Sequence, residues 1–305
     1  MRAVGYGMVT AGSILWGLNG PISRMALDAG VKPEQLAGWR VISAALLLTG
    51  CLVIVRKMQW RVSRRALKSI VLFGILGVSV PQFLYYEAIA RFDVGLTLVI
   101  VYTAPLWVAA FQRFAYGTRQ PREVLAAMVL ALVGVTLAVG GDVEGASAIG
   151  FVLAVCTSLA YTLQLLLAER LDSDVPAAPR LALSMIFAAV VWLIVPVVHD
   201  IPTALIRSDV PFGTTGYEVP LLLLIGYVVI GGTILPYACL VGGVSRIGPV
   251  AAGVTGMVEP IVAIVLSWVL LGQDLSVVQV VGIAIVLTCV VASERARSRA
   301  LAIPA

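Results

Sequence analysis

Ten long apolar stretches, separated by short polar connections, occupy almost the whole chain. A helix that crosses the ~30 Å hydrocarbon layer of a bilayer needs about 20 mostly apolar residues. Stretches such as 126–139 and 277–291 are almost continuously apolar, whereas the strands of a transmembrane β-barrel alternate between apolar and polar residues. The pattern therefore predicts an all-α integral membrane protein with ten transmembrane helices. The expected helices are Val4–Leu27, Gln35–Val55, Ser69–Ala90, Val94–Tyr116, Val124–Gly140, Ala148–Ala168, Leu181–Val198, Val219–Gly243, Pro249–Leu271 and Val277–Ala292.

The composition agrees with a chain whose solvent is largely lipid. Of the 305 residues, 60% are apolar and 12% are charged, against about 45–50% and about 25% in soluble domains. So few charged residues cannot cover a soluble surface, which argues against a soluble enzyme, a disordered protein and a secreted disulfide scaffold. The four cysteines lie far apart in apolar stretches, and the chain has one histidine, His199. Neither a metal site nor a cofactor is therefore expected.

The connections between the stretches are short, and even the longest, 199–218, is too short for a soluble domain. The nucleotide-binding pattern Gly-x-x-x-x-Gly-Lys-Ser/Thr does not occur in the sequence. If the protein pumps a solute, the energy is expected to come from a gradient or from a separate partner.

Basic residues fall mainly in alternate connections. Cytoplasmic loops of membrane proteins collect Lys and Arg, and with ten spans one set of connections holds 16 of the 21 basic residues while the other set holds 5. Both termini are therefore expected in the cytoplasm. This asymmetry also accounts for the net charge of +5. Nucleic acid is not expected as a partner, whereas the lipid bilayer and a small-molecule substrate are.

The chain contains an internal repeat. A gapless shift of 155 residues pairs positions in the two halves, and an earlier stretch aligns at a shift of 145, where Trp16 meets Tyr161 and Asn19 meets Gln164. We expect five-helix repeats over 1–142 and 143–294, followed by a basic cytoplasmic tail over 295–305. Because five is odd, the second repeat enters the membrane from the opposite side, as in transporters whose binding site lies between inverted halves. The pairs at the shift of 155 include Gly77 with Gly232, Pro81 with Pro236, Arg91 with Arg246, Pro105 with Pro260 and Gly117 with Gly272.

Two short motifs extend this picture: Leu15–Trp16–Gly17 in the first stretch and Glu259–Pro260 in the ninth. Together with the two five-helix halves, they resemble the EamA family of the drug/metabolite transporter superfamily. The resemblance implies transport of small metabolites across the bacterial cytoplasmic membrane, often export of amino acids. Family members often carry Gly-Glu after the fourth and ninth helices, where this chain has Gly117–Thr118 and Gly272–Gln273. A role that depends on those acids is not transferred.

Glu259 is the acid predicted deepest in the bilayer, about halfway along its stretch. An ionisable group at that depth is a functional candidate by default, here for proton coupling or for binding a substrate amine. The structural alternative is a hydrogen bond within the kink that Pro260 introduces, or an anchor for a neighbouring helix. The equivalent residue of the first half is Ala104, so the carboxylate belongs to one half.

Polar and aromatic residues at helical spacing predict a central cavity. Helical spacing places Ser13, Trp16 and Asn19 on one face and Thr157, Tyr161 and Gln164 on another. The alternative is interhelical packing, in which such residues act as hydrogen-bonding contacts. The full set expected at the cavity is Ser13, Trp16, Asn19, Gln82, Tyr86, Tyr102, Trp107, Thr157, Tyr161, Gln164, Tyr237 and Glu259.

Three further features concern the helices that surround this cavity. Glu87 and Arg91 are four residues apart and are expected to form an ion pair near a membrane boundary. Arg40, close to the start of its stretch, is expected to extend outward toward the interface rather than to bind a substrate carboxylate. The central prolines act either as pivots for alternating access or as static bends; they are Pro81, Pro105, Pro236 and Pro260.

The sequence thus favours a secondary transporter that exports small polar metabolites, amino acids or related compounds, by alternating access. Alternatives with the same fold are a carrier of drugs, hydrophobic metabolites or nucleotide sugars, and a passive facilitator. An intramembrane enzyme is disfavoured because neither a His-Glu-x-x-His pattern nor a pair of deep acids on facing helices is present in the sequence.

Overall fold

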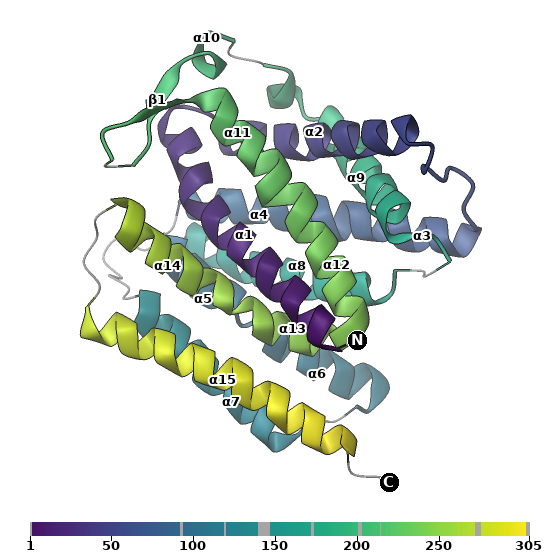
Figure 1. The fold of residues 1–305 in the computed structure, drawn as a ribbon, viewed down its shortest axis with the longest axis vertical. Coiled ribbons are helices and arrows are strands. Elements are labelled where there is room, and N and C mark those ends of the chain that lie inside the picture. Colours follow the sequence, from purple (N-terminus) through teal and green to yellow (C-terminus); the bar gives the residue numbers. More distant parts are fainter. Residues whose placement is uncertain are drawn as a thin grey trace.

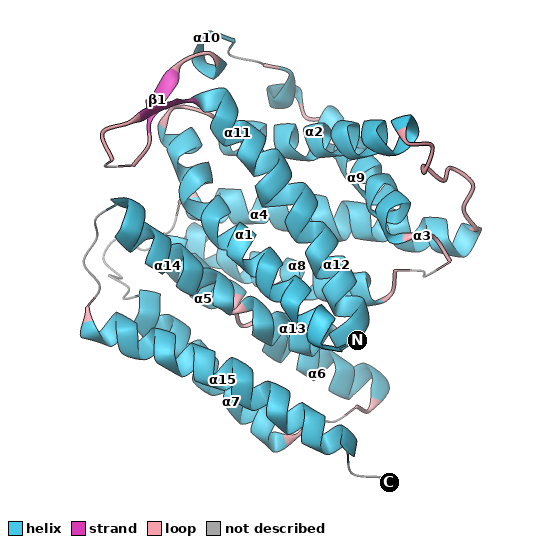
Figure 2. Ribbon diagram, in the orientation of Figure 1, coloured by secondary structure: helices cyan, strands magenta, loops and turns pink. Residues whose placement is uncertain are grey.

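The computed structural model describes residues 2–91, 94–118, 120–139, 147–171, 174–200, 203–213, 215–271 and 276–302. In these residues the chain is almost entirely helical (Figure 2). Most helices run across the view from its left side to its right side, α10 and β1 lie at the upper left, and the N and C labels lie toward the lower right (Figure 1). Part of the predicted boundary between the repeats, 140–146, and the last residues of the predicted tail, 303–305, lie outside the described residues.

Each of the ten predicted stretches coincides with a helix or with an interrupted helix. The first half contains α1 Arg2–Asp28, α2 Pro33–Ile54, α3 Arg64–Leu72, the π-helix η1 Phe73–Ser79, α4 Val80–Ile89, α5 Val94–Val101, α6 Ala104–Tyr116 and α7 Arg122–Val139. The second half contains α8 Ala148–Glu169, α9 Ala177–Leu193, η2 Pro196–His199, α10 Thr203–Ile206, β1 Asp209–Pro211, β2 Glu218–Pro220, α11 Leu221–Val229, the π-helix η3 Ile230–Ile234, α12 Leu235–Ile247, α13 Pro249–Gly256, α14 Val258–Leu271 and α15 Val277–Ala302. The last helix thus continues beyond the predicted end at Ala292 into the predicted tail.

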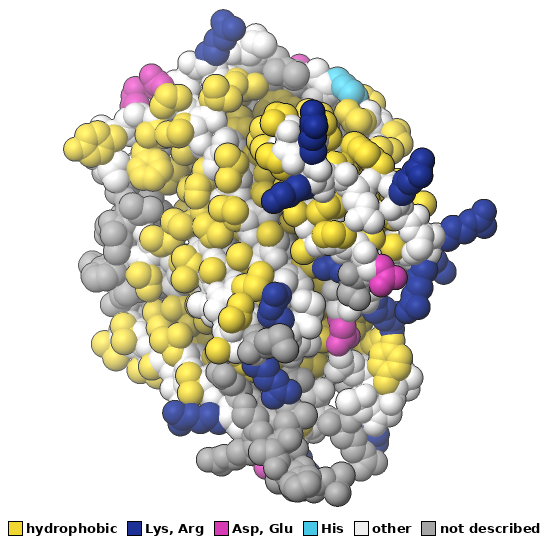
Figure 3. Space-filling view, turned by 45° about the vertical axis from the view of Figure 1, so that its right-hand side comes forward, with side chains coloured by type: hydrophobic (Ala, Val, Ile, Leu, Met, Phe, Trp, Pro, Cys, Tyr) yellow, Lys and Arg dark blue, Asp and Glu magenta, His cyan; other side chains and the backbone are white. Residues whose placement is uncertain are grey.

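The helices have the length and surface of a membrane protein. In the described part of the chain, five helices are long and apolar enough to cross a bilayer: 33–54, 64–89, 97–116, 148–169 and 221–247. Shorter apolar helices cover 177–193, 249–263 and 277–293. Large apolar side chains such as Ile54 and Phe114 point outward. In Figure 3 apolar side chains cover much of the visible face, and Lys and Arg gather mainly toward one side of the view.

The polar connection predicted over 199–218 contains the short helix α10 and the start of a two-stranded hairpin. Strands β1 and β2 pair antiparallel, with Asp209 opposite Pro220 and Pro211 opposite Glu218. This hairpin, magenta in Figure 2, lies at the end of the molecule away from the termini.

Four of the predicted helices are interrupted at equivalent places in the two halves. The π-helices η1 and η3 overlap when the chain is shifted by 155 residues, and each is followed by a proline, Pro81 or Pro236. The breaks before Pro105 and Pro260, at 102–103 and at 257, also correspond. Proline lacks an N–H and clashes with the preceding turn, so the paired prolines explain why single straight helices do not form there.

The helix contacts follow the same correspondence. Helix α1 packs against α12, and its counterpart α8 packs against α4. Two other pairs, α2 with α9 and α7 with α15, join a helix to its own counterpart. The contacts are therefore nearly unchanged when the two halves are exchanged.

Small residues allow the closest of these contacts, between α7 and α15. A Cβ atom at Gly282 would lie 2.4 Å from the Ala138 nitrogen and 2.6 Å from the Gly134 carbonyl oxygen. Such backbone approach through small residues is typical of helix pairs in membranes.

Gly282→Ala is therefore expected to lower the melting temperature of the purified protein by about 2–12 °C. Overpacking costs about 1–3 kcal/mol, and each kcal/mol corresponds to about 2–4 °C in a large domain. Gly226→Ala is the matched control, because a Cβ atom at Gly226 meets no atom within 4 Å. Equal melting temperatures of the two variants would contradict the packing described for α7 and α15.

Candidate functional site

A cavity at the centre of the bundle is lined by residues of both halves. Its walls come from α1, α2, α4, α5, α8, α12 and α14, together with the break after α5. Its lining residues are Trp16, Asn19, Gly20, Arg40, Pro81, Gln82, Tyr85, Leu98, Val101, Tyr102, Thr157, Tyr161, Gln164, Tyr237 and Glu259.

Nine of the twelve residues expected at the cavity meet there: Trp16, Asn19, Gln82, Tyr102, Thr157, Tyr161, Gln164, Tyr237 and Glu259. The other three lie elsewhere. The Ser13 hydroxyl donates to the Val9 carbonyl within its own helix, at 2.9 Å. Tyr86 is fully buried behind the cavity lining, and Trp107 is 46% exposed on the outside of α6. Trp107 was expected at the site because it lies close to Pro105, near the middle of its stretch, but its indole instead donates to the Thr103 hydroxyl at 3.1 Å.

Glu259 reaches the cavity from the start of α14. Its carboxyl group interacts with the Tyr102 side chain, which lines the same cavity. Helix α1 approaches closely at this point, because a Cβ atom at Gly17 would lie 2.8 Å from the Glu259 carbonyl oxygen. The glycine of the Leu15–Trp16–Gly17 motif thus permits α1 to pack against the backbone that carries the Glu259–Pro260 motif.

Aromatic rings form much of the cavity wall. The rings of Trp16 and Tyr237 meet edge to face with centroids 5.5 Å apart, and those of Tyr102 and Tyr161 do so at 6.4 Å. Edge-to-face packing is a favourable arrangement for such rings. The cavity therefore combines rigid apolar walls with a few polar groups, as small-molecule sites commonly do.

Gln82 and Tyr237 join the two halves inside the cavity. They are 155 residues apart and so occupy equivalent positions in the repeat. The Gln82 amide donates to the Tyr237 hydroxyl at 3.1 Å. Equivalent residues of two halves can touch each other only close to the axis that exchanges those halves, so this contact marks the cavity as the meeting point of the halves.

The prolines leave backbone carbonyls without their usual helical donor, four residues before each ring. The Gly232 carbonyl, four residues before Pro236, accepts from the Trp16 indole at 3.0 Å and from the Arg40 guanidinium. The equivalent Gly77 carbonyl, before Pro81, accepts a long 3.5 Å contact from the Tyr237 hydroxyl.

A third carbonyl follows the same rule. The Val101 carbonyl, four residues before Pro105, accepts from the Ser158 hydroxyl at 3.3 Å. Since no water reaches the interior of a bilayer to satisfy such groups, these side chains take the place of the missing backbone donors.

Arg40 points into the cavity, so the sequence-based expectation that it extends outward is wrong. Its side chain is 2% exposed and lines the cavity. Its Nε donates to the Thr233 hydroxyl at 2.8 Å, and one Nη donates to the Tyr86 hydroxyl at 2.5 Å. The other Nη donates to the Gly232 carbonyl. These acceptors lie on α4 and η3, deeper in the molecule than the interface, so they hold the guanidinium inward.

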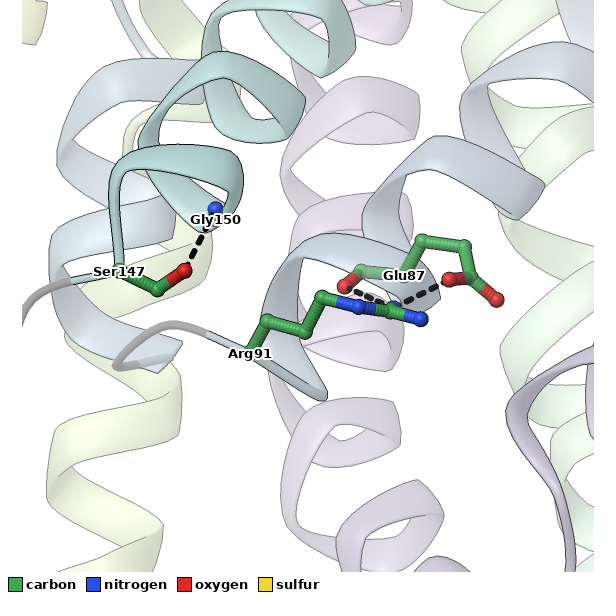
Figure 4. A network of polar contacts seen from close by, with 4 residues as sticks. All are labelled: Glu87, Arg91, Ser147 and Gly150. Carbon is green, nitrogen blue, oxygen red and sulfur yellow. Dashed lines mark hydrogen bonds and ion pairs between the residues drawn. The ribbon is translucent and has the colours of Figure 1, made fainter.

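The ion pair predicted at the end of α4 is present. The Arg91 guanidinium contacts the Glu87 carboxylate, and the same nitrogen donates to the Glu87 carbonyl at 3.0 Å (Figure 4). Nearby, the Ser147 hydroxyl accepts from the Gly150 amide at 3.4 Å and caps the start of α8. Both features stabilise helix ends next to the cavity, and neither residue pair lines it.

Sequence reasoning missed several lining residues, chiefly Arg40 and Tyr85. Arg40 carried a usable signal, because a basic residue within a membrane-spanning stretch is a functional candidate by default. Tyr85 carried no such signal. Its neighbour Tyr86 is also a tyrosine, and the sequence does not show which of the two faces the cavity, whereas in the structure Tyr85 does.

The helices, the apolar surface and the aromatic-walled cavity with its few polar groups are together typical of a multi-pass membrane transporter. The family model of EamA-like transporters matches residues 3–140 and 148–293. The chain therefore belongs to the EamA-like transporter family, within the drug/metabolite transporter superfamily.

Individual relatives are distant but similar over most of their length. The chain is 22% identical to the uncharacterized inner membrane transporter YicL of Salmonella typhimurium, over 96% of both chains. It is 25% identical to the uncharacterized inner membrane transporter YedA of Escherichia coli, over 94% of this chain and 89% of the relative. It is 24% identical to the threonine/homoserine exporter RhtA of Escherichia coli, over 83% of this chain and 80% of RhtA.

A solved crystal structure has the same fold. It superposes with a TM-score of 0.75 at 16% identity and covers 97% of this chain and 100% of its own. The membership in the family and the inner-membrane relatives identify this chain as a multi-pass transporter of the inner membrane.

Proposed function

We propose that the protein is a secondary transporter that exports small polar metabolites, with amino acids or related compounds as the leading class, across the cytoplasmic membrane. In this proposal ten helices form two inverted five-helix halves with both termini in the cytoplasm. The two halves rock about the central cavity and open it to each side in turn.

The central cavity carries this proposal. It lies where the two halves meet, and it presents one acid, one base and several amides and hydroxyls within aromatic walls. In secondary transporters with inverted repeats, substrate sites lie at this junction. The Gln82–Tyr237 contact and the matched interruptions of the helices support the inverted arrangement.

The size of the cavity favours a small solute. Its volume is about 90 Å³, below the range of about 300–1,000 Å³ typical of sites for drug-sized ligands. This conformation therefore suits a compact metabolite better than a drug or a nucleotide sugar. The relative RhtA, named a threonine/homoserine exporter, supports amino acids as the first compounds to test.

The test is transport by the purified protein in proteoliposomes loaded with labelled threonine, homoserine and other small metabolites. We expect saturable efflux that is accelerated by unlabelled solute on the opposite side. Ohmic current would instead indicate a channel. Flux that follows only the concentration gradient of the solute, and that no ion or pH gradient alters, would indicate a passive facilitator. Transport restricted to hydrophobic drugs or nucleotide sugars would replace the proposed substrate class.

A further inference from the structure

Arg40 has hydrogen-bonding capacity that the protein does not use. A guanidinium carries five N–H donors, and three of them donate to the Thr233 hydroxyl, the Tyr86 hydroxyl and the Gly232 carbonyl. In the described part of the chain, the remaining two donors have no protein acceptor. Because Arg40 lines the cavity, those donors are available to a molecule that enters it.

The charge of Arg40 is also left unbalanced at close range. Its three hydrogen-bond acceptors are neutral groups, and among the described residues it forms no ion pair. A charge buried in the membrane without an ionic partner is costly and marks a functional site. An anion bound next to Arg40 would supply the missing partner.

The acid of the cavity lies apart from this cation. Glu259 interacts with Tyr102, and among the described residues no ion pair joins it to Arg40. Tyr85, which lines the same cavity, is within electrostatic range of both charges. The cavity therefore presents a cationic group and an acidic group that form no ion pair among the described residues, within aromatic walls.

We propose that Arg40 is the residue that selects the transported solute, by binding a carboxylate of that solute through its two unused N–H donors. This inference rests on the proposed transport function and names the group that the site recognises. Guanidinium and carboxylate match in charge and in geometry, and the paired hydrogen bonds are stronger than those between neutral groups.

The experiment compares acids with their matched alcohols. Thermal stabilisation of the full chain in detergent is measured with L-threonine against L-threoninol, and likewise for homoserine, leucine and phenylalanine. For the wild-type protein we expect at least one acid to stabilise, and its alcohol to bind about tenfold more weakly or worse, the size expected for lost charge-assisted hydrogen bonds. In Arg40→Gln this preference should disappear, and in Arg40→Lys it should persist in part.

Thr233→Val separates recognition from a purely structural role of Arg40. It removes one hydrogen bond to Arg40 but keeps the charge, and Thr233 does not line the cavity. If Arg40 binds the solute, Thr233→Val keeps the preference for acids; if Arg40 only holds the helices, this variant resembles Arg40→Gln. Should Arg40→Gln fail to fold, the wild-type pairs and Arg40→Lys decide the question.

Several outcomes would overturn the inference: alcohols that bind as well as acids, a preference that survives in Arg40→Gln, or binding of no acid in the set. The flux assay in proteoliposomes distinguishes these binding results from a failure of the proposed transport function. Transport of a solute without a carboxylate would leave the proposed function standing and remove the role of Arg40. Absence of flux for every solute would remove the proposed function.

Discussion

Glu259→Gln is expected to reduce gradient-driven efflux to the level of liposomes without protein. Glutamine matches the size of the side chain and can still interact with Tyr102, the partner of Glu259 in the cavity, but it cannot release and rebind a proton. If Glu259 couples transport to protons, net efflux driven by an imposed pH gradient should stop. Exchange of labelled for unlabelled solute should continue, since exchange moves no net protons.

Glu87→Gln is the matched control for this result. Glu87 also lies on a helix near the cavity, but it is paired with Arg91 and does not line the site. We expect its gradient-driven efflux to remain close to that of the wild-type protein. Equal gradient-driven efflux by Glu259→Gln and the wild type would show that the coupling proton is carried elsewhere or that transport is not proton-coupled.

Pro236→Ala is expected to impair transport strongly while the protein stays as stable as the wild type or becomes more stable. Alanine restores an N–H that can donate to the Gly232 carbonyl, four residues earlier, and a proline within a helix costs about 3 kcal/mol. A regular helix would then compete with the Trp16 and Arg40 donors that now meet this carbonyl. The cavity wall should lose the position of both side chains.

The measurements are the melting temperature in detergent and the rate of solute efflux. Pro33→Ala serves as the control, because Pro33 lies in the first turn of α2, where no helical donor is missing. We expect Pro33→Ala to leave efflux largely unchanged. Wild-type efflux by Pro236→Ala would mean that the interruption at η3 is not needed for transport.

The sequence predicted the helical framework well because apolar length is a direct requirement of the bilayer. Each expected stretch coincides with a helix, and the shift of 155 residues correctly paired the places where helices are interrupted. The sequence did not predict how those interruptions are built. Pro81 follows a π-helix, η1, whereas Pro105 follows a break before α6, and the presence of a proline does not distinguish the two.

The cavity was predicted less completely because orientation depends on distant partners. Trp16, Tyr161 and Glu259 meet as expected, since helical spacing and depth fix which faces can point inward. The direction of Arg40 depends on acceptors up to 193 residues away in the chain, which spacing alone does not reveal. Trp107 deviates in the opposite direction: it lies near the middle of its stretch but faces outward, where its indole donates to the Thr103 hydroxyl.

The donors at the proline-freed carbonyls cross from one half of the chain to the other. Trp16 and Arg40 serve Gly232, while Tyr237 and Ser158 of the later half serve Gly77 and Val101 of the earlier half. A half expressed alone would lose these donors inside a solvent that offers no replacement. Neither half is self-sufficient, because the freed carbonyls at its bends are satisfied by donors from the other half.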